Sequence, residues 1–266
     1  MNKNNCVVIV SSCDAYEDAW APFFTLFFRY WPDCPFPVYL VSDTKIYNDY
    51  RVTTLNVGYC EFWSDRTKRA LEMISQKYLI NFHEDFLIRE RVDNQKILTL
   101  LDYVRNHDTT CLRLNPVAKP DLPYDNKLNL GEISPKAVYR VSLHSSIWNR
   151  QSLLGLLVRG ETAQEMEMNG TIRSRKMDKL FLSVQDPAIN YFETAIIRGK
   201  WTYDGVRLCK KNGIKIDLTK RPIDYSLKLR TVLDGWRKLN WARKLREFPI
   251  LGSVFAKVFG KISRSL

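Results

Sequence analysis

Short apolar runs alternate with helical segments along the first half of the chain. Four runs rich in β-branched or aromatic residues predict strands: residues 7–10, 38–41, 52–55 and 78–82. Residues 20–30 and 65–76 have the apolar spacing of helices, and Pro22 stands near a helix start, where proline is tolerated. Strands alternating with helices at this spacing predict an α/β layer sandwich.

The second half continues this alternation with a longer interruption. Residues 93–106 and 146–158 predict helices, and residues 111–114 and 139–143 predict strands. Between them, residues 115–135 contain four prolines and a glycine and predict a long loop. A loop of this length in a compact domain is usually functional or a lid.

Polar residues follow directly on three of the predicted strands. They are Ser11, Ser12 and Asp14 after the first strand, Asp43 after the second, and Glu84 and Asp85 after the fourth. In open α/β sheets ligands bind outside the carboxyl ends of the strands. The sequence therefore predicts a binding site at this edge.

Composition narrows the class of protein. With 45% hydrophobic and 12% aromatic residues among 266, the chain can bury a core and is not disordered. No window reaches the ~18 uninterrupted apolar residues of a spanning helix, and the N-terminus shows no secretory cleavage site. Six scattered cysteines without a Cys-x-x-Cys pair exclude the common zinc signatures and predict a reducing, cytosolic setting.

The positive charge is concentrated at the C-terminal end. Residues 225–266 hold 10 Lys/Arg against two acids, which is +8 of the formal +12. We therefore divide the chain into a domain over 1–224 and a basic tail over 225–266. The tail's apolar positions recur at helical spacing, which is typical of a basic amphipathic helix on an anionic membrane surface. Packing on the domain or on a partner subunit is the alternative, while nucleic-acid binding lacks a basic body or a motif.

Several blocks of the sequence have a recognisable pattern. The most specific is Ser12–Phe24 followed by Tyr30–Pro35, and later blocks are Phe62–Arg66, Tyr78–Phe86, Ser142–Trp148 and Glu165–Gly170. Together, over roughly residues 6–205, they resemble bacterial glycosyltransferases of surface-polysaccharide gene clusters. The resemblance implies a GT-A fold, a Rossmann-like mixed sheet flanked by helices. It also implies sugar transfer from a nucleotide-diphosphate-sugar donor to a glycan or lipid-linked acceptor in polysaccharide or lipopolysaccharide assembly, peripherally at the inner membrane.

The chain departs from the family pattern at the residues that bind the metal. Most GT-A enzymes carry Asp-x-Asp after the fourth strand, whereas His83-Glu84-Asp85 stands there in this chain. A hard cation shares oxygen ligands with substrate phosphates, so Glu84 and Asp85 could hold Mn²⁺ or Mg²⁺ together with the donor. A metal-independent site stays open, as does a helix-capping role for the two acids.

The resemblance also suggests catalytic roles. Glu167 is the candidate general base, because an inverting transfer needs a carboxylate within reach of the acceptor hydroxyl. Glu165 could serve instead, and a retaining reaction would need neither. Both acids could equally lie on a solvated face, and His144 is expected to be a satisfied buried histidine.

The remaining candidates concern the donor. Ser11, Ser12 and Asp14 are expected to contact the nucleoside, although Asp14 could merely shape a turn. Arg66, near a helix start, and Arg173 are expected to face the diphosphate, with surface positions as the alternative.

Two rival functions remain open. A nucleotidyltransferase has a similar sheet but usually carries a glycine-rich loop after the first strand, where this chain has Ser11-Ser12-Cys13-Asp14. A membrane-associated scaffold that keeps the fold without activity is the other.

Overall fold

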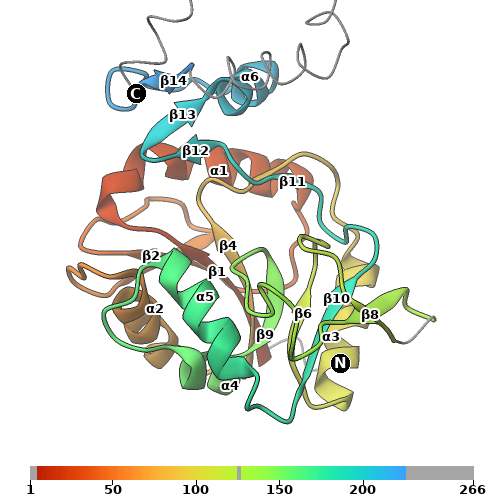
Figure 1. Ribbon diagram of the computed structural model, residues 1–266. Helices are drawn as coiled ribbons and strands as arrows, with labels where there is room; N and C mark the ends of the chain where they lie inside the picture. Colours follow the sequence, from red (N-terminus) through yellow and green to blue (C-terminus); the bar gives the residue numbers. More distant parts are fainter. Residues whose placement is uncertain (1–4, 125–126, 226–266) are drawn as a thin grey trace, which may run out of the picture.

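The computed structural model describes residues 5–124 and 127–225 of the chain (Figure 1). Within this part, nine strands form the main sheet: β1 (Cys6–Ser11), β2 (Val38–Ser42), β3 (Val52–Asn56), β4 (Tyr78–His83), β6 (Thr109–Arg113), β7 (Leu122–Pro123), β8 (Leu130–Glu132), β9 (Ser146–Asn149) and β10 (Leu180–Val184). Their order is β3-β2-β1-β4-β9-β6-β10-β8-β7. The expected α/β architecture with a mixed sheet is confirmed.

The N-terminal half of the sheet is entirely parallel. β1 pairs with β2 on one side and with β4 on the other, and Ser11 lies opposite His83 at the end of the second ladder. The order β3-β2-β1-β4 is that of a Rossmann-like half, in which the direction of strand addition reverses beside β1. All four strands were predicted within about two residues. The apolar runs of β1, β2 and β4 are largely buried on both faces of the sheet, whereas β3, at the sheet edge, buries only Val52 and Leu55.

The C-terminal half of the sheet is mixed, and here three predictions were wrong. β9 runs antiparallel between β4 and β6, so the expected helix over 146–158 is a strand followed by the shorter α4 (Arg150–Leu156). Both faces of β9 are buried, so its apolar pattern does not distinguish a strand from a buried helix. The expected strand over 139–143 is a turn, and the expected loop over 115–135 contains β7 and β8, which pair with each other and extend the sheet beyond β10.

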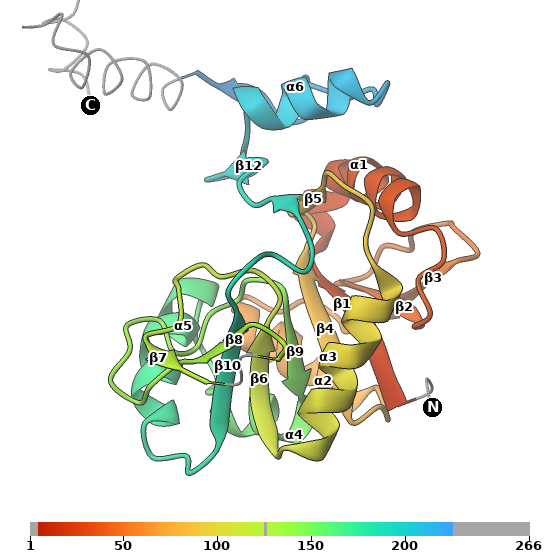
Figure 2. The ribbon, with the colours of Figure 1, turned by 90° about the vertical axis from the view of Figure 1, so that its right-hand side faces the viewer.

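Helices cover both faces of the sheet (Figure 2). α1 (Glu17–Tyr30) and α3 (Asn94–Asn106) pack on one face, and α2 (Trp63–Glu72), α4 and α5 (Ala163–Ser174) pack on the other. Side chains of β1 alternate between the two cores: Val8 and Val10 enter the first, Val7 and Ile9 the second. Such alternation is the period-2 geometry of a strand, and it fixes the register because a one-residue slip would exchange the two faces.

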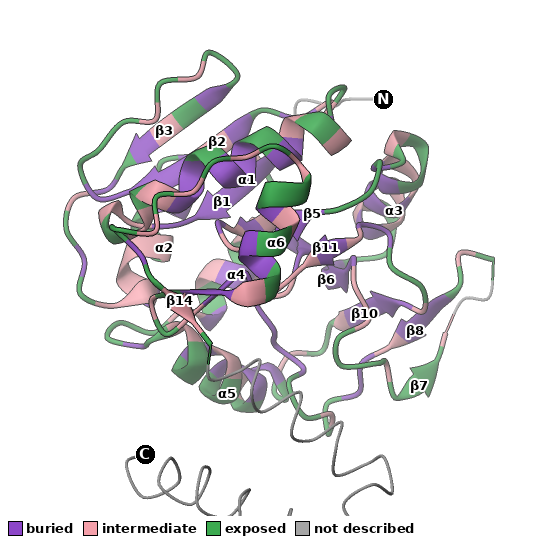
Figure 3. Cartoon of the chain, turned by 90° about the horizontal axis from the view of Figure 1, so that it is seen from above, coloured by how far each residue is buried: buried purple, intermediate pink, exposed green. Residues whose placement is uncertain are grey.

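The last described segment returns over the edge at which the parallel strands end. β11 (Tyr191–Phe192) pairs with β5 (Leu87–Ile88), and the chain then forms a small layer of β12 (Ile196–Ile197), β13 (Lys200–Thr202), α6 (Tyr203–Lys211) and β14 (Ile223–Asp224). Figure 1 shows this layer above α1, and Figure 3 looks down on it with α6 in front of β1. We call residues 194–225 the C-terminal layer.

Arg221 attaches the C-terminal layer to the start of α1. Its guanidinium makes two bonds of 2.9 Å to the Asp18 carboxylate and donates to the carbonyls of Ala15 (2.7 Å) and Gly199 (2.8 Å). Both charged side chains are buried, at 8% and 9% exposure. This is a buried, forked ion pair with its hydrogen bonds satisfied, the geometry in which such a pair compensates for desolvation.

No helix among the described residues is long and apolar enough to cross a membrane. All six cysteines are free thiols. Residues 226–266, which make up almost all of the predicted tail, lie outside the described residues, so the division at 224/225 stays a prediction.

Replacing Arg221 with Ala should strongly destabilise the chain. The substitution leaves Asp18 buried without its counter-charge, and breaking such a pair costs about 3–5 kcal/mol. Urea unfolding measures this loss, with Arg91→Ala as the matched control. Arg91 pairs with Asp33 on the surface, where both side chains are more than half exposed, so its loss should cost less than about 1 kcal/mol. Equal effects of the two substitutions would contradict the conclusion that Arg221 attaches the C-terminal layer to the start of α1.

Candidate functional site

The parallel pairing of β1 with β4 brings two strand ends together. Ser11 and His83 are partners in the ladder, so Ser12 and the pair Glu84–Asp85 leave the sheet side by side. This place is the point where strand order reverses, and it is where open α/β sheets bind ligands. The expected convergence of strand-end residues is therefore present in the structure.

Glu84 and Asp85 form an acidic pair at this edge, in which Glu84 is buried and Asp85 is half-buried. Burial raises the pKa of both carboxyls well above their usual range, and the neighbouring Asp85 charge raises that of Glu84 further. The Ser12 hydroxyl hydrogen-bonds the Glu84 carboxyl, and the backbone N–H of Ile196 hydrogen-bonds that of Asp85. Two carboxyls held this way lack a full counter-charge, so a cationic group bound beside them would be strongly favoured.

Ser11 and Ser12 are held by two indole rings. The Nε1–H of Trp20 donates to the Ser12 hydroxyl oxygen at 2.7 Å, and that of Trp63 donates to Ser11 at 3.0 Å. Both serines are nearly inaccessible, with exposures of 6% and 8%. Their hydroxyls thus fix the end of β1. The Ser12 hydroxyl hydrogen-bonds Glu84 and is therefore not available to a ligand in this arrangement.

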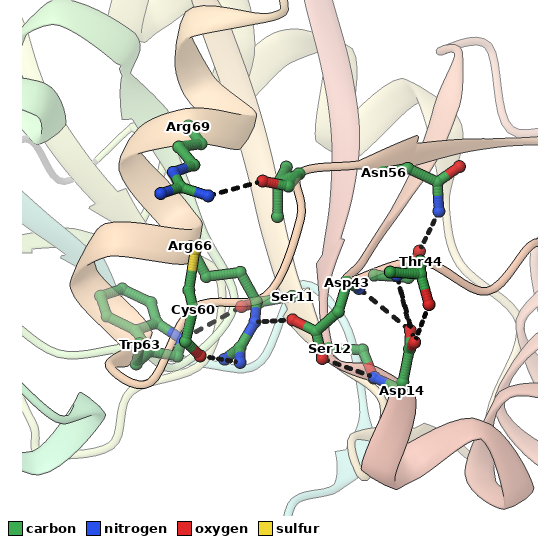
Figure 4. A network of polar contacts seen from close by, with 12 residues as sticks. Ser11, Ser12, Asp14, Asp43, Thr44, Asn56, Cys60, Trp63, Arg66 and Arg69 are labelled. Carbon is green, nitrogen blue, oxygen red and sulfur yellow. Dashed lines mark hydrogen bonds and ion pairs between the residues drawn. The ribbon is translucent and has the colours of Figure 1, made fainter.

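Asp14 shapes the turn that follows β2 (Figure 4). Its carboxylate accepts the backbone N–H groups of Asp43 (3.0 Å), Thr44 (3.1 Å) and Lys45 (3.1 Å), and also the Thr44 hydroxyl (2.7 Å). Burial raises the pKa of Asp14, but these hydrogen bonds outweigh it and hold the pKa below its usual value. The geometry is that of the turn-shaping alternative, while contact with a nucleoside stays a prediction.

Arg66 joins the same network from α2. Its Nε–H donates to Asp43 at 3.0 Å and its Nη2 donates to the Cys60 carbonyl at 2.6 Å (Figure 4). Asp43 in turn accepts the backbone N–H of Asp14 at 3.2 Å. Arg66 thus stands at the strand-end edge with its charge matched by Asp43, and a diphosphate there would compete with that carboxylate.

The three candidates on α5 do not come together. Glu165 closes a capping box with Thr162 at the start of the helix. Glu167 accepts the Leu143 N–H at 2.8 Å and the Ser142 hydroxyl at 3.1 Å, in the turn that leads into β9. This turn lies beside the end of β4, so Glu167 is the one of the three whose side chain reaches the strand-end region.

Arg173 lies at the opposite edge of the sheet. It pairs with Glu161 through two bonds of 2.8 and 2.7 Å. It also lines a cleft with Lys77 and Asn149, which stand at the start of β4 and the end of β9. The structure therefore does not bring Arg173 to the strand ends. Helix α5 carries it away because eight residues separate it from Glu165, about 12 Å along the axis.

The positions of other groups around the acidic pair could not be predicted from a sequence pattern. The charge of Arg221 acts on Glu84, and its guanidinium lies 4.4 Å from the centre of the Tyr16 ring. Burial lowers the pKa of His83 to about 4, so this imidazole is neutral beside the pair. Arg221 is 203 residues from Asp18, a separation at which no local pattern reports contact.

The described residues hold no group of three or more His, Cys, Asp or Glu side chains arranged as a metal site. Glu84 and Asp85 alone provide hard oxygen ligands of the kind that Mg²⁺ or Mn²⁺ shares with substrate phosphates. Any metal here would thus depend on the donor for part of its coordination.

Comparisons with known proteins give only distant likenesses. No family model and no curated protein matches the chain. Among solved structures, S. aureus TarS (residues 1–349) is 14% identical with a TM-score of 0.42, over 68% of this chain and 60% of its own. UDP-glucose pyrophosphorylase complexed with UDP-glucose is 8% identical with a TM-score of 0.48 (73% and 94%), and bifunctional IspDF from Campylobacter jejuni is 11% identical with a TM-score of 0.39 (72% and 52%). The chain thus spans 60% of the TarS fragment, and we take its function from its own residues.

Replacing Asp14 with Asn should destabilise the chain by about 1–3 kcal/mol at pH 7, because an amide cannot accept all the N–H groups that converge on the carboxylate. The effect should shrink in acid. The pKa of Asp14 is lowered in the folded state, so its stabilisation is present above about pH 4 and disappears as pH falls through the folded-state pKa.

Urea unfolding at pH 7, 5 and 3 measures both effects. Asp178→Asn is the control, since Asp178 is exposed and its loss should change stability by less than about 0.5 kcal/mol. A destabilisation by Asp14→Asn that stays constant from pH 7 to pH 3 would show that the carboxylate charge is not involved.

Proposed function

We propose that this chain is a glycosyltransferase that moves a sugar from a nucleotide-diphosphate-sugar donor to a hydroxyl of a glycan or lipid-linked acceptor in bacterial polysaccharide or lipopolysaccharide assembly. The observation that carries the proposal is the acidic pair of buried Glu84 and half-buried Asp85 at the strand-order reversal, beside the end of β1. A Rossmann-like half supports binding of a nucleotide at that reversal. The resemblance of the strand-end blocks to glycosyltransferases supports the same reaction.

Asp85, with Glu84, would hold the donor diphosphate through Mn²⁺ or Mg²⁺. The fit rests on two adjacent carboxyls whose pKa values are raised chiefly by desolvation. When bound, the metal would neutralise charge that develops on the leaving diphosphate. Ser11 and Ser12 set the position of the pair through β1, and Asp14 and Arg66 order the neighbouring rim.

Nucleotidyl transfer is the second candidate. The end of β1 argues against it: Ser11-Ser12-Cys13-Asp14 contains no glycine, and the two serines are occupied by indole N–H groups, so this is no open phosphate loop. Pyrophosphate release from a nucleoside triphosphate and a sugar 1-phosphate would identify this activity. A scaffold without activity is the third candidate and would bind no donor.

A place on the cytoplasmic side of the inner membrane, held peripherally, fits the distribution of charge. The C-terminal layer holds eight Lys/Arg and three Asp/Glu, a net +5, whereas residues 1–193 sum to −1. On α6 the buried positions are Gly205, Val206 and Cys209, and three exposed cations share the other face: Arg207, Lys210 and Lys211. The basic surface thus begins before the predicted tail, which supports attraction to anionic lipid.

Replacing Asp85 with Asn should strongly impair donor use. We expect one of UDP-glucose, UDP-galactose, UDP-N-acetylglucosamine or GDP-mannose to raise the melting temperature of the wild type, more so with Mn²⁺. Asp85→Asn should remove the metal-dependent part and lower donor turnover on the order of 10²-fold, as expected when charge stabilisation of the leaving group is lost. Glu90→Gln is the matched control, because Glu90 is a nearby exposed acid. Unchanged turnover in Asp85→Asn would remove the site assignment.

Neutralising α6 should weaken membrane binding. Each cation near an anionic surface contributes about 1 kcal/mol, so Arg207→Gln, Lys210→Gln and Lys211→Gln together should lower partitioning roughly 10²-fold. Co-sedimentation with vesicles of phosphatidylcholine and phosphatidylglycerol measures this, with deletion of 229–266 in parallel. The control triple carries Lys68→Gln, Lys119→Gln and Lys136→Gln, exposed cations outside the C-terminal layer. Equal losses in the two triples would show that net charge alone matters, and binding unaffected by the deletion would contradict a role for the tail.

A further inference from the structure

His144 lies in the turn before β9, at the same edge as the acidic pair. Its Nδ1 is 3.2 Å from the Tyr191 hydroxyl and 3.4 Å from a Glu193 carboxylate oxygen. Its side chain is 21% exposed and that of Glu193 is 38% exposed, so both are reachable from solvent. The ring is therefore not the fully enclosed core histidine that the sequence suggested.

A stack of rings connects His144 to the acidic pair. The imidazole lies on Phe86, with ring centres 5.8 Å apart and planes inclined by 20°. Phe86 directly follows Asp85 and also stacks on Tyr191, at 4.9 Å and 12°. His144 thus stands next to the peptide that carries Glu84 and Asp85, on the side toward β9.

The turn that carries His144 is fixed from two directions. The amide of Asn81, on β4, donates to the Leu143 carbonyl at 2.8 Å and accepts the Ser146 N–H at 3.0 Å. From α5, Glu167 accepts the Leu143 N–H and the Ser142 hydroxyl through the same oxygen. By accepting these hydrogen bonds, Glu167 fixes the backbone of the turn, so it acts as a positioning residue.

The contacts of Nδ1 decide which imidazole nitrogen is free. Nδ1 is in hydrogen-bond contact with the Tyr191 hydroxyl, which also accepts the Ser145 N–H at 3.1 Å, and it lies near a Glu193 carboxylate oxygen. Because an ionised carboxylate only accepts hydrogen bonds, we assign the proton to Nδ1, which donates to the Tyr191 oxygen with Glu193 beside it. The lone pair is then on Nε2, which makes no hydrogen bond or ion pair with any described residue. An imidazole that is held through Nδ1–H, with a carboxylate next to it and Nε2 open, has the arrangement of a general base.

We propose that His144 is the general base of the sugar transfer, with Glu193 orienting its ring and Glu167 positioning its turn. This inference rests on the proposed glycosyltransferase function and replaces Glu167 as the base. The acceptor hydroxyl oxygen forms a bond to the anomeric carbon, and the bond from that carbon to the diphosphate oxygen breaks. The diphosphate leaves with the electron pair, and the hydroxyl proton passes to Nε2 of His144. A displacement of this kind inverts the anomeric configuration.

The charges around His144 suit this role. Burial lowers the pKa of His144, Glu193 and Glu167 raise it, and Arg113 lowers it, so the ring is neutral at pH 7 and able to accept a proton. The titratable and charged groups that face it are Tyr191 and Glu193 beside β11, Glu167 on α5, Arg113 at the end of β6 and His83 at the end of β4. The two carboxylates would stabilise the imidazolium that forms.

The test uses the full chain and the nucleotide sugar that stabilises it in the thermal-shift panel. Release of UDP or GDP is followed with water as the acceptor, and proton NMR identifies the anomer first released. His144→Gln should lower the rate by about 10²-fold or more, with donor affinity unchanged. His107→Gln is the matched control, because His107 stacks on Tyr103 beyond the end of α3.

Glu193→Gln provides a second, milder variant at a partly exposed position. Because Glu193 raises the pKa of His144, its loss should move the rising limb of the pH–rate profile to lower pH. The chain has three histidines, so NMR titration of the imidazoles, assigned by substitution, should show the same shift for His144 alone. This readout does not depend on activity, and a purely structural role would not produce the matching shift in the rate profile.

The outcomes separate the two proposals. Normal donor binding with wild-type rates in His144→Gln, or release of the retained anomer, would overturn the role of His144 and leave the glycosyltransferase proposal standing. A rate profile that Glu193→Gln leaves in place would also overturn it. If no nucleotide sugar of the panel binds to the wild type, the proposed function fails, and the inference about His144 fails with it.

Discussion

The parallel pairing of β1 with β4 is the constraint on which the rest of the structure depends. Its register places Ser11 opposite His83, and from there Ser12 reaches Glu84. The register is held by alternation into two separate cores, so a slip of one residue would move every β1 side chain to the wrong face. The site is therefore as rigid as the sheet, although the residues that form it are about 70 positions apart in the chain.

Two adjacent carboxyls, one buried and one half-buried, are costly for a folded chain, and the structure reduces that cost without removing it. Hydrogen bonds from Ser12 and the Ile196 N–H act on the pair, and the Arg221 charge lies nearby, but Arg221 is committed to Asp18. A charge that is poorly compensated in the free protein and well compensated in the complex contributes favourable free energy to ligand binding. This is why we place the donor here rather than at the other strand-end acids, Asp14 and Asp43, whose charges are already used within the fold.

The sequence predicted the N-terminal half of the fold well, since β1, β2 and β4 are apolar runs that are largely buried on both faces and the edge strand β3 buries Val52 and Leu55. It failed at β9, because a four-residue strand inserted between β4 and β6, with only Ile147 and Trp148 apolar, has no periodicity that distinguishes it from the start of a buried helix. At the site, strand-end acids could be predicted from position alone. The contacts of Arg221 and of His144 with Glu193 could not, because they depend on how distant segments cross the edge of the sheet.

The distribution of positive charge would set how the strand ends are oriented at an anionic surface. Residues 194–266 hold 18 Lys/Arg and five Asp/Glu, whereas residues 1–193 hold 23 and 24. The basic part begins in the C-terminal layer, and that layer is bonded to the acidic pair through Ile196 and to the start of α1 through Arg221. An anionic surface that attracts the basic part would therefore also orient the strand ends. If the acceptor is lipid-linked and the chain is held at the membrane, as we propose, the acceptor would meet the site along the same edge.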